Sequence, residues 1–165
     1  MDIPKDLYEL YAEYGIAAEK AQVLETEAGN VAIAFVTLLV GIDELDDKKK
    51  KFYSNLVKDV NRKTLGNLLK HIKTIVDFDE KGIEIIDEAL KQRNYLAHHY
   101  FRVHNFAIFR ADDRKKMVQE LKEIQKKLDM AHANLISISS LLEKLSCLDL
   151  PDVEKLVKAG KKVKI

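Results

Sequence analysis

A short stretch near the middle of the chain combines residue types that suit phosphate chemistry. It reads Arg93-Asn94-Tyr95-Leu96-Ala97-His98-His99-Tyr100-Phe101. An arginine side chain offers a fork of donors that matches phosphate oxygens, and a histidine titrates near neutral pH. Together the two groups suit cleavage of a phosphodiester bond without a metal ion.

Helical spacing favours a shared site for three of these residues, because the stretch follows an acidic, amphipathic segment that reads as a helix. The buried face expected for this helix is defined by Ile83, Ile86 and Leu90. On a helical wheel Arg93, Asn94 and His98 then lie on or beside the core-facing half, whereas His99 points away. We therefore select His98 over His99 as the reactive histidine.

The neighbouring side chains suit supporting roles. Asn94 and His98 are four residues apart, so the amide can hold one imidazole nitrogen and orient the ring. Ala97 is small and leaves space between Arg93 and His98, and Tyr100 is expected at the rim of the site. The plainer interpretation is a helical interaction protein in which Arg93 forms a salt bridge and His98 is a satisfied interface residue.

The pattern Arg93-Asn94-x-x-x-His98, late in a helix of an all-α chain, resembles the signature of the HEPN superfamily, an arginine and a histidine separated by four to six residues. The longer pattern Arg93-x-x-x-x-His98-x-Tyr100 is similar to that of HEPN toxins encoded with a nucleotidyltransferase antitoxin. In those systems the antitoxin adenylylates the tyrosine, which here would be Tyr100.

The resemblance implies an antiparallel up-and-down bundle of four to five main helices, usually dimeric, with ribonuclease activity in many members. Attack by a ribose 2′-hydroxyl needs a base at the nucleophile and an acid at the leaving oxygen, and two copies of His98 around a two-fold axis would supply both. Arg93 and His98 are then catalytic and Asn94 orients. The alternative is a non-catalytic HEPN module that binds a protein or a nucleotide, similar to a mannitol-operon repressor.

Composition sets the frame for these expectations. The chain has 165 residues, 47% of them hydrophobic and 33% charged, with two prolines, six glycines and no tryptophan. These values indicate one all-helical domain over residues 1–165. The net charge of +1 argues against a protein that coats nucleic acid by bulk electrostatics. We expect a cytoplasmic location, because the first residues do not resemble a secretion signal and the single Cys147 fits a reducing compartment.

Apolar spacing, glycine stops and N-cap residues predict the helices. They cover residues 1–15, 16–40, 43–61, 65–76, 78–103 and 113–145, followed by a short C-terminal helix and basic tail in residues 150–165. Gly15 is expected to break the chain between the first two, Thr64 to cap the fourth, and Asp77 with Glu80 to form a capping box for the fifth. Residues 105–110 read as a packed connection.

Metal and cofactor sites are not expected. Asp129 and His132 are three apart, as in metal-binding bundles, but such sites need a second pair and further inward glutamates, which we do not find. The sequence also lacks a glycine-rich phosphate loop. The expected partners are therefore RNA, a second copy of the chain, and a nucleotidyltransferase-type antitoxin or another regulatory protein, with no membrane.

Overall fold

The computed structural model describes residues 3–40, 47–146 and 163–164. Its elements are α1 (Lys5–Val40), α2 (Asp47–Val60), α3 (Leu65–Ile75), β1 (Val76–Asp77), α4 (Glu80–His98), α5 (Tyr100–Val103), a 3-10 turn η1 (Ala107–Phe109), α6 (Ala111–Ser146) and β2 (Val163–Lys164). The prediction of an all-α chain is confirmed for the described residues. None of their helices is long and apolar enough to cross a membrane.

The chain divides into two compact units, to which α1, α4 and α6 each contribute a part. Unit 1 comprises Met1–Leu24 and Glu84–His132, and unit 2 comprises Glu25–Ile83 and Ala133–Ile165. The expectation of a single domain over residues 1–165 stays a prediction. The motif from Arg93 to Phe101 lies wholly within unit 1.

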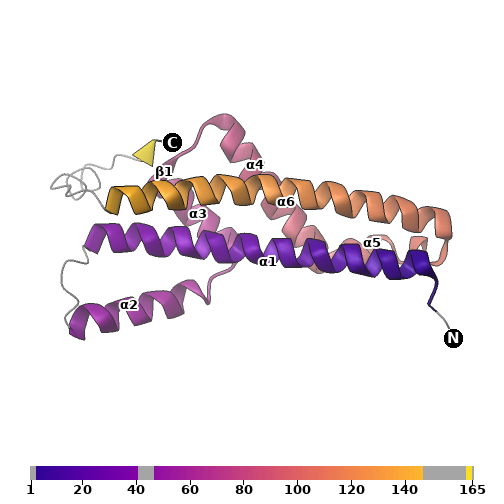
Figure 1. Cartoon of the computed structure of the whole chain (residues 1–165), viewed down its shortest axis with the longest axis horizontal. Coiled ribbons are helices and arrows are strands. Elements are labelled where there is room, and N and C mark those ends of the chain that lie inside the picture. The colour runs from indigo at the N-terminus through magenta and orange to yellow at the C-terminus, as the bar shows by residue number, and fades with distance from the viewer. Residues whose placement is uncertain (1–2, 41–46, 147–162, 165) are drawn as a thin grey trace. The chain divides into compact units, whose positions relative to one another are not determined.

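In unit 1 the two long helices α1 and α6 pack side by side and run in the same direction (Figure 1). Their contacts advance together along both helices: Asp6 pairs with Arg114, Glu13 with Gln125, and Lys20 with Asp129. The opposite order holds between α4 and α6, because Glu88 pairs with Lys127 and Tyr95 with Glu120. The antiparallel order of α4 and α6 fits the up-and-down arrangement predicted for consecutive helices, whereas the prediction did not address α1 with α6.

Apolar residues at helical spacing form the core of unit 1. The buried members are Leu10, Ala17, Ala21 and Leu24 on α1, Ile86, Ala89 and Leu96 on α4, Tyr100 on α5, and Met117, Leu121, Ile124, Leu128 and Ala131 on α6. Full burial of one such large side chain stabilises the fold by about 1.5 to 3 kcal/mol. The stripe predicted along α6 is confirmed throughout this unit.

The predicted break at Gly15 is wrong, because α1 continues through it as one helix of 36 residues. Gly15 is exposed, and a Cβ added there would meet nothing within 4 Å. A glycine inside a helix costs about 1 kcal/mol relative to alanine. Burial of Leu10 and Ala17 on either side outweighs that cost and keeps the helix continuous.

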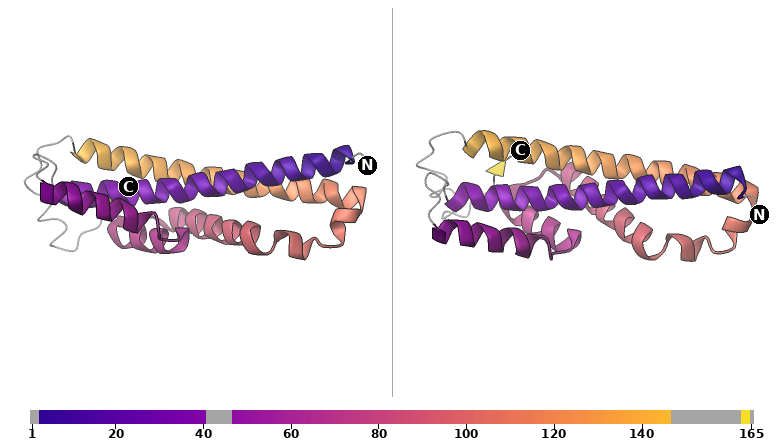
Figure 2. Two further views of the ribbon diagram at one scale, coloured as in Figure 1. Left: turned by 90° about the horizontal axis from the view of Figure 1, so that it is seen from below. Right: turned by 60° about the horizontal axis from the view of Figure 1, so that its bottom comes forward.

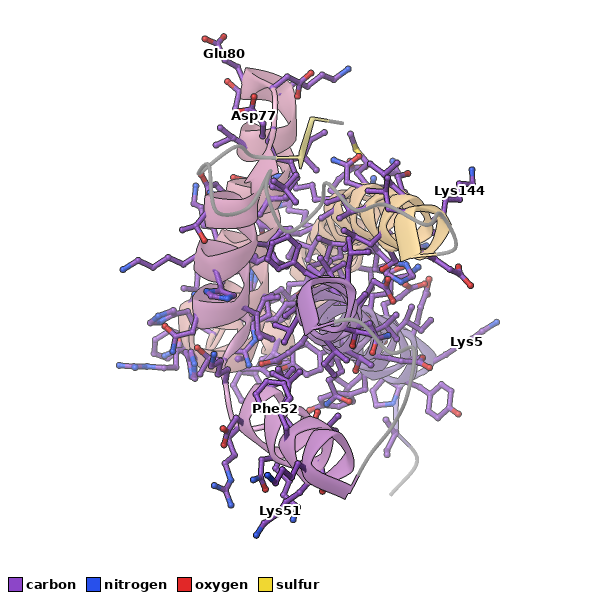
Figure 3. The ribbon with its side chains drawn as sticks, turned by 90° about the vertical axis from the view of Figure 1, so that its left-hand side faces the viewer. Lys5, Lys51, Phe52, Asp77, Glu80 and Lys144 are labelled. Carbon is purple, nitrogen blue, oxygen red and sulfur yellow. The ribbon has the colours of Figure 1, made fainter. Side chains whose placement is uncertain are left out.

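Unit 2 contains the C-terminal parts of α1 and α6 together with α2 and α3, and α2 lies beside α1 (Figure 2). Glu27 on α1 accepts a hydrogen bond from Ser139 on α6. A Cβ on Gly29 would lie 3.2 Å from the Val60 side chain, so this glycine permits a close approach of α2. The exposed Lys51 on α2 points away from the rest of the unit (Figure 3).

Two helix starts in unit 2 differ from their predicted caps. Thr64 occupies the N-cap position of α3, but its side chain makes no cap bond, and Glu25 Oε1 instead accepts from the Leu65 amide at 2.9 Å. α4 begins at Glu80, and Asp79 Oδ1 accepts from the Gly82 amide at 2.7 Å. Asp77 cannot form the predicted capping box because it belongs to strand β1, which pairs with Val163 and Lys164 in β2.

The C-terminal boundaries also differ from the prediction. α4 ends at His98 rather than at Val103, since His99 leaves the helical conformation with φ −128° and ψ −27° before α5 begins. The C-terminal helix predicted within residues 150–165 lies outside the described residues, except that Val163 and Lys164 form a short parallel strand instead of a frayed tail. The remaining helices begin and end within a few residues of their predicted limits.

Candidate active site

The motif residues lie on the last two turns of α4. Asn94 and His98 are exposed, and Arg93 is half-buried. Arg93 Nη1 donates to Asn94 Oδ1 at 3.3 Å. Because Asn94 and His98 are four residues apart in one helix, their side chains leave α4 on the same face. The structure thus brings Arg93 and Asn94 into contact and places His98 one turn from Asn94 on α4.

The predicted rotation of α4 is wrong. Ile83, one of the three residues expected to define the buried face, is 39% exposed, whereas Ile86 is buried as expected, together with Ala89 and Leu96. The buried face is turned by roughly 80° from the expected one, so Asn94 and His98 face away from the core of unit 1. Asn94 and His98 therefore keep their hydration.

The corrected rotation changes two of the arguments made from the sequence. His98 and His99 are both exposed, so orientation toward the core no longer separates them. Their rings lie 6.3 Å apart between centroids at 74°. Asn94 contacts Arg93, and within the described ranges it makes no hydrogen bond to His98. The predicted orienting role of Asn94 toward His98 stays a prediction.

Tyr100 does not lie at a rim. Its side chain is 0% exposed, and its hydroxyl donates to the Met117 carbonyl at 2.9 Å. Its ring contacts Tyr14, Tyr95 and Phe101 at centroid distances of 5.6, 5.8 and 5.2 Å. Tyr100 follows the irregular backbone at His99 and lies in the core, where burial and the nearby Glu120 carboxylate raise the pKa of its phenol.

A second polar cluster lies beside the motif and joins three segments of unit 1. Tyr95 donates to Glu120 Oε1 at 3.0 Å, and His104 Nε2 lies 2.7 Å from Glu120 Oε2. The Tyr95 hydroxyl is also 3.3 Å from His104 Nε2. The His104 side chain is only 19% exposed.

Glu120 had no predicted role. It follows the buried Met117 by three residues and precedes the buried Leu121, which places its carboxylate at the border of the apolar stripe. That position could have identified Glu120 from the sequence, because an acid at the edge of a buried face needs a hydrogen-bond donor from a neighbouring element. Tyr95 provides one such donor.

The cluster predicts a specific alkaline response. Burial and the hydrogen bond to Glu120 raise the pKa of Tyr95 to about 12, against an ordinary value near 10. A phenol whose pKa is raised by folding stabilises the fold below pH about 10, and that contribution is lost as the pH rises toward about 12. Between pH about 10 and about 12, the free energy of unfolding should therefore fall less for Tyr95→Phe than for wild type. Urea unfolding at several pH values measures this difference.

Tyr8→Phe is the matched control, because Tyr8 is 70% exposed on α1. Its stability profile should follow that of wild type between pH about 10 and 12. Identical profiles for the Tyr95 and Tyr8 variants would contradict the burial of the Tyr95 hydroxyl against Glu120.

No group of three His, Cys, Asp or Glu side chains that could hold a metal ion is found among the residues that the structure describes. Asp129, one member of the predicted helical pair, accepts from Lys20 Nζ at 2.6 Å.

Comparison with known proteins adds no relative. The chain matches no protein-family profile, no curated protein and no solved structure. The resemblance to HEPN proteins therefore rests on the residues from Arg93 to Phe101 and on the helical character of the chain.

Proposed function

We propose that this chain is a metal-independent endoribonuclease of the HEPN type, which cleaves RNA in a site shared by two copies. The supporting observation is the exposed face of α4, on which Asn94 and His98 lie one turn apart with Arg93 beside them. A group that must reach a phosphate and a second protomer has to be accessible, and His98 is.

The reaction follows from the chemistry of the three side chains. His98 of one copy takes the proton of the ribose 2′-hydroxyl, whose oxygen attacks the adjacent phosphorus. The bond from phosphorus to the 5′ oxygen breaks, and His98 of the second copy protonates that leaving oxygen. The products are a 2′,3′-cyclic phosphate and a 5′-hydroxyl. Arg93 binds the scissile phosphate and stabilises its additional negative charge in the transition state.

Two copies are required because one chain contributes one His98, and base and acid must act on opposite sides of the phosphorus. A two-fold axis near the end of α4 would supply the second histidine from an identical surface. An effector of this kind, such as a toxin or a phage-defence protein, would act with a nucleotidyltransferase-type antitoxin or another regulatory protein as its partner.

A mixing experiment tests the shared site. Wild-type protein is allowed to exchange subunits with increasing amounts of His98→Ala protein, and cleavage of a labelled RNA is measured. Because each active site needs both histidines, the activity should fall with the square of the wild-type fraction. An activity that falls in proportion to the wild-type fraction would mean that each copy acts alone.

A binding module without cleavage is the second candidate. Arg93 already donates to Asn94 within the chain, so part of its donor capacity is used before any ligand arrives. In that case wild type and His98→Ala would bind a nucleotide or protein partner equally, and neither would cleave RNA.

A further inference from the structure

The segment that follows α5 exposes apolar side chains to an unusual degree. Phe106 and Phe109 are each 80% exposed, and Val103 is 62% exposed. Isolated apolar residues on a surface need no explanation, but neighbouring phenyl rings that remain in water indicate a binding surface. All three residues belong to unit 1 and lie close in sequence to the motif on α4.

The backbone arranges the two rings in a defined way. Phe106 is the N-cap of η1 and Phe109 is its last residue, and the Phe109 amide donates to the Phe106 carbonyl at 3.3 Å. Side chains three residues apart in a 3-10 turn eclipse each other and differ by roughly 6 Å along its axis. A base that stacks on one ring can therefore reach the same side of the turn as the other ring.

The charge around the rings favours a polyanion. Residues 89–111 contain no Asp or Glu, but they hold Lys91, Arg93, Arg102 and Arg110. Arg102 is exposed, and within the described residues its guanidinium forms no ion pair or hydrogen bond. The first carboxylates that follow are paired with cations: Asp112 with Lys115, and Asp113 with both Lys116 and Arg110.

This charge also decides between the candidate occupants. A second copy seated symmetrically on the surface would bring Arg102 of both copies together, and like charges oppose such an interface. A single-stranded nucleic acid presents both complementary features, because its bases stack on aromatic rings and its phosphates attract arginine. Duplex RNA offers the phosphates but keeps its bases stacked inside the helix.

We infer that Phe106, Phe109 and Arg102 form a binding site for an unpaired stretch of RNA. One base stacks on the phenyl rings, and Arg102 binds the adjoining backbone. The inference rests on the proposed function and specifies its substrate as single-stranded RNA. It adds a second surface that binds the substrate, apart from the Arg93 and His98 side chains.

The test measures binding in the His98→Ala background, so that the RNA is not cut. Fluorescence anisotropy follows a labelled single-stranded RNA and a duplex RNA of similar length and charge. The double change Phe106→Ala with Phe109→Ala should weaken single-strand binding about tenfold and duplex binding less than about twofold. The double change to Tyr should retain the affinity, because tyrosine preserves an aromatic face.

Two further variants separate stacking from charge. Arg102→Gln should weaken binding of both RNAs and reduce its salt dependence, since it removes one phosphate contact. Tyr8→Ala is the matched control, because Tyr8 is an exposed aromatic residue on α1. It should bind both RNAs as the His98→Ala background does.

Three results would overturn the inference. They are unchanged single-strand binding by the double alanine variant, equal loss of single-strand and duplex binding, and a change of oligomeric mass in sedimentation with RNA affinity unaffected. If the last occurred, the surface would be an interface between copies.

The experiment also separates this inference from the proposed function. Loss of cleavage in His98→Ala alone, with normal binding by the phenylalanine variants, would retain the ribonuclease and remove the stacking site. Phenylalanine-dependent binding of single strands by a wild type that never cleaves RNA would do the reverse.

Discussion

His98→Ala is expected to abolish RNA cleavage and leave the fold intact. A positioned acid or base contributes about 10²- to 10⁴-fold to a reaction rate, and the shared site loses both of these groups in the variant homodimer. His98 is exposed, so its removal creates no cavity and should leave the thermal unfolding transition close to that of wild type. The measurement is cleavage of a labelled single-stranded RNA, with circular dichroism to follow folding.

His99→Ala is the matched control for this experiment. His99 is the next residue, is exposed like His98, and also satisfies the spacing from Arg93. It lies outside the regular part of α4, whereas His98 shares a helical face with Asn94. Cleavage by His99→Ala should therefore persist. Loss of activity in His99→Ala with retention in His98→Ala would reassign the reactive histidine.

Tyr100→Ala is expected to have the largest effect on stability. Truncation of a fully buried aromatic side chain costs about 3 to 5 kcal/mol of the free energy of unfolding. Tyr100 has 0% exposure and packs against three other aromatic rings of unit 1. Tyr100→Phe keeps the ring and loses only the hydrogen bond to Met117, so its cost should be about 1 kcal/mol. Urea unfolding followed by circular dichroism measures both values.

The same pair of variants tests the role of Tyr100 suggested by the HEPN toxins. If the tyrosine acts as a core residue, Tyr100→Phe should cleave RNA like wild type. Enzymatic modification of its hydroxyl would first require this side chain to leave the core. A stability cost below about 1 kcal/mol for Tyr100→Ala would contradict the observed burial.

Much of the fold could be predicted from periodicity. The stripe from Met117 to Ala131 is regular over many turns, so only one face of α6 could be buried. The break at Gly15 could not be judged in the same way, because a local propensity of about 1 kcal/mol competes with packing that the sequence does not display. The direction of α1 relative to α6 likewise depends on contacts between distant residues, such as Asp6 with Arg114.

The site was predictable in its membership and less so in its orientation. Arg93, Asn94 and His98 could be identified from residue type and spacing. The rotation of α4 could not, because Ile83 on one side and Ala89 with Leu96 on the other offer two apolar faces, and tertiary packing selects between them. The cluster of Tyr95, His104 and Glu120 depends on residues up to 25 positions apart, which no local pattern links.

The interruption at His99 has a mechanical consequence for the reactive residues. Tyr95, four residues before His99, donates a hydrogen bond to Glu120 on α6. Tyr100, the residue after His99, donates one to the Met117 carbonyl on the same helix. His98 and His99 thus lie in a short segment that is held to α6 by a hydrogen bond on each side. A segment held in this way has little conformational freedom to lose when RNA or a second copy binds, so under the proposed function His98 would be preorganised for reaction.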